Sequence, residues 1–126
     1  MSIRISTPAA AFAAAFVSLA LAAPCLAEGK VRIVDCRVES EGKVQVRGKC
    51  RFIPDEGGSF TIEHADPKRT VFFGEIMSVS VTIISPGVAE VRGLTRQGVN
   101  SRWGEARRMA NDRACWQGSD FKICAR

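Results

Sequence analysis

The feature that most constrains the fold of this chain is an alternation of apolar and polar residues, which begins at Val31 and recurs along most of the later sequence. Successive side chains of a β-strand point to opposite faces, so this alternation predicts strands with one apolar and one wet face. The clearest run covers residues 76–82, and the turn-forming stretches SEG (40–42) and SPG (85–87) separate such runs. The sequence therefore predicts an all-β, mainly antiparallel fold of about seven strands, either a small curled sheet or a barrel.

One stretch departs from this pattern. Residues 98–112 show no strand alternation and contain EARRMA, which could form a turn or two of helix. We therefore expect one long loop or short helix near residues 98–112. Long excursions from compact domains often carry function, so this is the first place to look for a binding surface.

The beginning of the chain differs in kind from the rest. Within residues 1–27 Arg4 is the only charged residue, and the apolar run at 9–23 is shorter than the roughly 20 residues that cross a bilayer. Small residues follow this run, which is typical of a cleaved signal peptide. The sequence predicts a signal peptide at 1–27, a single disulfide-stabilised β-rich domain at 28–126, and a periplasmic or secreted location.

Cys25 offers an alternative, because lipoprotein signals end at a cysteine that is then acylated. Such signals want a small residue just before the cysteine, and this chain has Pro24 there. An ordinary cut before Glu28, with Cys25 and Ala27 in the small-residue positions, is the better interpretation.

The remaining cysteines, Cys36, Cys50, Cys115 and Cys124, are even in number, which in an exported chain predicts two disulfides. Four cysteines allow three connectivities, and we favour Cys36–Cys50 with Cys115–Cys124. A two-residue turn at Ser119–Asp120 would place Cys115 directly opposite Cys124.

The other pair fits less simply. A three-residue turn at 40–42 would place Cys36 opposite Val46, too far along the strand from Cys50 for a direct bond. Either the hairpin contains a bulge, for which Gly48 is the candidate, or these two cysteines bond elsewhere.

Three short motifs carry a resemblance. GSFTI at 58–62, ACW at 114–116 and ICA at 123–125 resemble a pattern found in small exported bacterial proteins of unassigned function. The likeness covers residues 58–125 and implies a disulfide-bonded β-domain. It carries over no catalytic residue.

Redox and metal chemistry are not favoured. Eight residues separate Cys115 from Cys124, whereas thiol oxidoreductases place two residues between their cysteines. His64 is the only histidine, and no two cysteines form the close pair typical of zinc sites. We expect no metal and no cofactor.

The sequence also lacks the residues that common hydrolases and nucleotide-binding loops use. The chain has one histidine and no tyrosine, and EGGSF has neither the lysine nor the following helix of a phosphate-binding loop. A glycosidase would need a carboxylate pair. The acidic residues that lie close together in the sequence are Asp55, Glu56, Glu63 and Asp66. Acidic residues near turns are more often solvated caps than catalytic groups, so we expect no enzyme.

The candidate partner-binding residues lie in the irregular stretch. From Arg92 to the end the chain is predominantly basic, and arginines flank a tryptophan there. Trp116, by contrast, is expected in the core, packed over a disulfide. Export argues against a nucleic acid as the partner. The predicted partner-binding residues are Arg102, Trp103, Arg107 and Arg108.

Two functions remain. The favoured one is a non-catalytic binding or structural protein of the cell envelope, whose basic loop meets an anionic glycan, a lipid head group or a protein. The alternative is an inhibitor of a hydrolase such as lysozyme. Known bacterial lysozyme inhibitors carry Ser-Gly followed by Tyr on the inserting loop, and this chain has neither.

Overall fold

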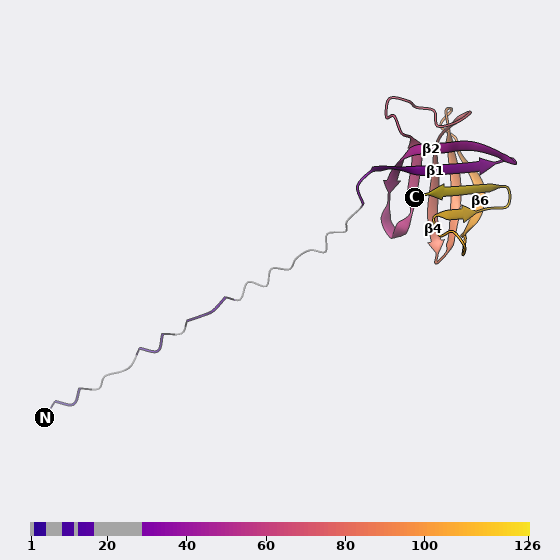
Figure 1. Cartoon of the computed structure of the whole chain (residues 1–126). Helices are drawn as coiled ribbons and strands as arrows, with labels where there is room; N and C mark the ends of the chain where they lie inside the picture. Colours follow the sequence, from indigo (N-terminus) through magenta and orange to yellow (C-terminus); the bar gives the residue numbers. More distant parts are fainter. Residues whose placement is uncertain (1, 5–8, 12, 17–28) are drawn as a thin grey trace.

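The computed structural model of the chain describes residues 2–4, 9–11, 13–16 and 29–126. The rest of the predicted signal peptide, with its cut before Glu28 and the alternative lipid site at Cys25, lies outside the described residues. Eight strands form a closed antiparallel barrel in which each strand pairs with the next along the chain and β8 pairs with β1 (Figure 1). The strands are β1 (Arg32–Ser40), β2 (Lys43–Pro54), β3 (Phe60–His64), β4 (Ile76–Ser85), β5 (Val88–Thr95), β6 (Asn100–Arg108), β7 (Cys115–Gln117) and β8 (Phe121–Ala125).

The predicted all-β, antiparallel fold is confirmed, with a closed barrel rather than an open sheet. The only helix among the described residues is the single-turn η1 (Glu56–Gly58), so none of them form a helix that could span a membrane. Figure 1 shows β1, β2 and the β7–β8 hairpin running crosswise to β4 and its neighbours.

The expectation of a loop or short helix near residues 98–112 was wrong, because β6 occupies most of this stretch and pairs with β5. A β-bulge hides the strand from the sequence pattern. Val91 pairs with Gly104 and Arg92 pairs with Arg102, which leaves Trp103 as the extra residue. The bulge moves the inward positions from odd to even numbers, so no single alternation runs through the strand.

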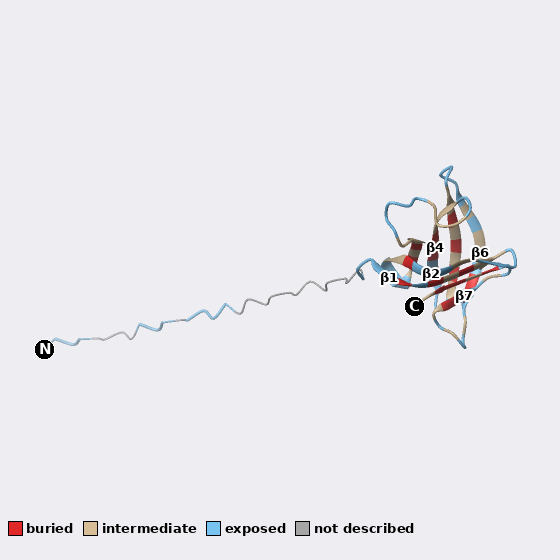
Figure 2. Ribbon diagram, turned by 45° about the horizontal axis from the view of Figure 1, so that its top comes forward, coloured by how far each residue is buried: buried red, intermediate tan, exposed pale blue. Residues whose placement is uncertain are grey.

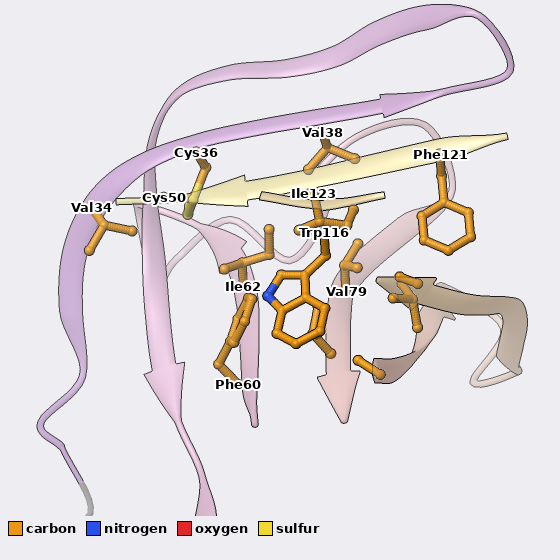
Figure 3. Packing of buried hydrophobic residues seen from close by; sticks show 14 residues of the cluster. Val34, Cys36, Val38, Cys50, Phe60, Ile62, Val79, Trp116, Phe121 and Ile123 are labelled. Atoms are coloured by element: carbon orange, nitrogen blue, oxygen red, sulfur yellow. A yellow bond between two sulfur atoms is a disulfide. The ribbon is translucent and has the colours of Figure 1, made fainter. Parts of the chain in front are cut away.

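The barrel interior is filled by side chains. Trp116 is 1% exposed, and Figure 3 shows its indole pointing inward, toward the side where Ile62 and Val79 lie. The turns carry most of the exposed residues, while buried residues recur along the strands (Figure 2). The alternation recognised in the sequence therefore marks the true core face, whose largest fully buried aliphatic residues are Val38, Ile62, Val79, Val81, Val91 and Ile123.

The predicted Cys36–Cys50 bond is confirmed, but the predicted hairpin register was wrong. The turn has two residues, Glu41 and Gly42, which both adopt positive φ (53° and 73°), and it joins Ser40 directly to Lys43. A bulge then follows at Gln45 rather than at Gly48. Together these features place Cys36 opposite Gly48, one diagonal step from Cys50.

The predicted Cys115–Cys124 bond is also confirmed, and in the predicted register, with the two cysteines directly opposite each other. Because Trp116 and Ile123 point into the barrel, their neighbours Cys115 and Cys124 point to its outer face. Trp116 is therefore a core residue as expected, but this disulfide lies on the other side of the sheet from its ring. The first disulfide, in contrast, belongs to the interior cluster.

Both disulfides should contribute to stability, by different amounts. Removing either through a Cys→Ala pair should lower the free energy of unfolding by about 3 kcal/mol in the chain-entropy model, since the two loops are of similar length. All four cysteines are buried, but only Cys36 and Cys50 pack in the cluster inside the barrel, so the Cys36→Ala/Cys50→Ala pair should cost more. Chemical denaturation of the two double variants measures this order, and the reverse order would contradict the assignment of Cys36–Cys50 to the interior.

Candidate functional site

A recess with a cavity volume of about 570 Å³ opens at one end of the barrel. The β1–β2 turn, the segment before β4, the first half of β6 and the β7–β8 turn meet there. Figure 1 shows the β1–β2 and β7–β8 turns on the same side of the barrel, and the Glu41 N–H donates to the Asp120 carbonyl (3.2 Å). The lining residues are Ser40, Glu41, Gln45, Phe73, Gly74, Glu75, Ile76, Ser101, Arg102, Trp103, Asp120 and Phe121.

Three aromatic rings form the apolar part of this recess. Trp103 meets Phe73 and Phe121 edge to face, with ring centroids 6.2 and 5.7 Å apart. The rings come from three different parts of the chain, and Phe121 is nearly buried. Such a set of packed rings offers an apolar contact area with little conformational entropy left to lose on binding.

Gly93 creates the space for the Trp103 indole. A Cβ atom at Gly93 would lie 2.7 Å from Nε1 of Trp103, closer than real Cβ contacts allow. Gly93 pairs with Ser101 on the neighbouring strand, and the bulge at Trp103 directs the ring across this bare backbone. A glycine on β5 and a bulge on β6 thus place the ring in the recess.

The rim of the recess carries more negative than positive charge. Glu41, Glu75 and Asp120 line it, and none of the ion pairs among the described residues involves these carboxylates. Arg102 is the one basic lining residue, and its guanidinium already pairs with Glu90 (3.3 Å). The recess therefore favours neutral or cationic groups.

One wall of the recess is an open strand edge. The β6–β7 ladder joins only Arg107 and Arg108 to Gln117 and Trp116, because β7 is three residues long. Among the described residues, no strand pairs with the first part of β6 on that side. On the side away from β5, the backbone from Asn100 to Ala106 therefore lies beside the aromatic rings without a neighbouring strand.

The structure separates the four residues predicted to bind a partner. Arg102 and Trp103 line the recess, whereas Arg107 and Arg108 lie at the other end of β6. Arg107 pairs with Glu105 (3.1 Å), and the Arg108 guanidinium lies over the Trp116 ring, 4.8 Å from its centroid. All four belong to a strand rather than to the expected loop.

Sequence reasoning missed most of the recess. Glu41, Phe73 and the adjacent Asp120 and Phe121 come from three distant parts of the chain, and each looks like an ordinary turn or strand residue. The FFGE stretch at 72–75, which places two rings before a glycine and a carboxylate outside any alternating strand, was the one local signal available.

Three titratable groups outside the recess have structural roles. His64 Nδ1 accepts the Asp66 N–H (2.9 Å), and the Asp55 carboxylate accepts the Glu56 N–H (2.8 Å). A hydrogen bond from Arg126 lowers the pKa of Asp112. The ion pair between these two residues holds Arg126 beside Cys115. In the described part of the chain, no three His, Cys, Asp or Glu side chains gather in a way that could hold a metal ion.

Comparisons with protein-family models, with curated proteins and with solved structures found no match to this chain.

Placing a methyl group at position 93 should disturb the recess from within. We expect Gly93→Ala to lower the free energy of unfolding by roughly 1–3 kcal/mol, because the added Cβ overlaps the Trp103 indole. In a Trp103→Leu background the same change should cost much less, since the indole is gone. Denaturation of the wild type, both single variants and the double variant measures this coupling; equal costs in the two backgrounds would contradict the contact.

Proposed function

We propose that this chain is an exported, non-catalytic binding protein of the cell envelope that takes its ligand in the recess. The observation that carries the proposal is an open cavity of about 570 Å³ in which three aromatic rings meet a polar rim. Binding sites commonly combine an apolar floor with a few placed polar groups.

Two features support export. The disulfides Cys36–Cys50 and Cys115–Cys124 suit an oxidising compartment, where such bonds form and persist. The signal-peptide pattern at 1–27 agrees with this location. A periplasmic or secreted protein of this size is well served by cross-links, because its core is small.

Binding without catalysis is supported by the side chains available. The four cysteines of the domain are bonded in pairs, so none offers a thiolate nucleophile. His64 does not line the recess, and its Nδ1 is occupied by a backbone N–H. The recess presents apolar contact area and hydrogen-bonding groups, which are what a binding site needs.

The anionic partner expected from the sequence would meet a different surface. The recess rim is acidic, so an anion would instead bind where Arg107 and Arg108 are exposed, at the far end of β6. Inhibition of a lysozyme-type hydrolase also stays a prediction from the sequence.

Retention on a sulfated matrix tests the anionic partner. If Arg107 and Arg108 form its site, the Arg107→Ala/Arg108→Ala protein should elute at a clearly lower salt concentration than the wild type. The matched control is Lys30→Ala/Arg47→Ala, which removes the same charge at other exposed positions. An equal shift in both double variants would show that only net charge matters.

Ligand mapping by NMR tests the proposed function. A fragment library of small aromatic, amine, sugar and amide compounds is titrated into isotope-labelled protein. We expect the shifted signals to cluster on Ser101, the Trp103 indole N–H and Phe121, and the cluster to vanish when Phe121 becomes Ala. The proposal is wrong if no fragment binds at millimolar concentration, or if binding fragments cluster on another face.

A further inference from the structure

We propose that the recess is a docking groove for an extended peptide segment of a partner protein, which adds as a strand to the open edge of β6. The inference rests on the proposed function, because the same recess would take side chains of that peptide. It goes further by assigning the chemical class of the ligand and the backbone groups that bind it.

The first support is the direction of the β6 backbone groups. The Thr95 N–H donates to the Val99 carbonyl (2.9 Å), which places Val99 on the β5 side. Since these groups alternate along an antiparallel ladder, Asn100 and Arg102 direct their N–H and C=O away from β5. The pairs Leu94–Asn100 and Arg92–Arg102 in the register agree with this direction.

The far end of β6 gives the same result from the other side of the bulge. The Arg108 N–H donates to the Gly87 carbonyl, toward β5, whereas the Met109 N–H donates to the Cys115 carbonyl, toward β7. Glu105 therefore also faces away from β5, at a point beyond the end of β7. Outside the strand ladders, no backbone hydrogen bond among the described residues satisfies Asn100, Arg102 or Glu105.

The second support is the length of this edge. From Asn100 to Ala106 the strand extends on the order of 20 Å, which suffices for a short peptide strand with several main-chain hydrogen bonds. Proteins usually cover such an edge or blunt it. The bulge at Trp103 and the charges of Arg102 and Glu105 would blunt it against self-pairing, but they do not account for an aromatic-lined cavity directly beside it.

The third support is the fit of that cavity to peptide side chains. A strand placed against β6 would point alternate side chains toward Trp103 and its neighbouring rings, in a recess large enough for apolar anchors. The carboxylates of Glu41, Glu75 and Asp120 on the rim are complementary to lysine or arginine. The expected segment is therefore an extended peptide that carries an apolar or aromatic anchor and a basic residue near it.

Removing the backbone N–H of residue 102 tests strand addition. The protein, exported with both disulfides formed, is used to select binders from a library of random linear peptides. The best binder is then measured on Arg102→Ala and Arg102→Pro proteins, which lack the same side chain and differ in the N–H. We expect Arg102→Pro to bind about tenfold more weakly than Arg102→Ala, because it loses a hydrogen bond that the peptide would complete. Thermal unfolding of both variants checks that each is folded.

Methylated peptides provide an arm that needs no protein variant. N-methyl groups are placed one at a time along the selected peptide, and each version is measured on wild-type protein. Strand addition predicts loss of binding at every second amide and little change at those between. Equal effects at neighbouring amides, or equal binding to Arg102→Pro and Arg102→Ala, would overturn the inference.

The outcomes separate the two proposals. If the peptides compete with the recess-binding fragments but show no alternating methylation pattern, strand addition is wrong and the recess remains a binding site. If neither peptides nor fragments bind there, both proposals fail. If sedimentation shows a dimer that Arg102→Pro dissociates and Arg102→Ala does not, the edge pairs with a second copy and the partner-peptide inference is overturned.

Discussion

Closure of the sheet by the short hairpin of β7 and β8 is the constraint on which the rest of this structure depends. The hairpin carries Trp116 into the barrel centre and is cross-linked at its base by Cys115–Cys124. Paired backbone bonds between Asp35 and Arg126 (both 2.9 Å) extend its contact with β1. Because β7 ends at Gln117, the same closure leaves the first part of β6 without a partner on the side away from β5.

The recess is a consequence of that incomplete pairing. Where β6 and the closing hairpin separate, the interior would be open to water, and aromatic rings from β6, β8 and the segment before β4 fill part of the gap. A filled barrel cannot hold a ligand at its centre, so the recess at this end is the place that we propose for binding. The acidic rim and the free strand edge then favour an extended, basic peptide over an anion.

The sequence predicted the fold well where one rule acted alone. Alternation identified β4 and β5 and their core face, and the expected turn at Ser119–Asp120 identified the Cys115–Cys124 bond. The even cysteine count favoured Cys36–Cys50 as well, although the expected register of the first hairpin did not allow that bond directly. The prediction was wrong where a bulge changed the register or the alternation of a strand. The turn at Glu41–Gly42 with a bulge at Gln45 shifted the first hairpin register, and the bulge at Trp103 concealed β6. Bulges interrupt the period of two, so a pattern search reads them as loop.

By itself the sequence determined the class of fold and the inward face of the regular strands, because these follow from local periodicity and turn chemistry. It favoured the observed pairing of the cysteines but left two other connectivities open. Only the tertiary structure decided the site. Phe73, Trp103 and Phe121 meet because the sheet closes on itself into a barrel. The edge of β6 is open because the neighbouring strand, β7, has only three residues. Neither fact is written in any one segment, since each depends on contacts between residues far apart in the chain.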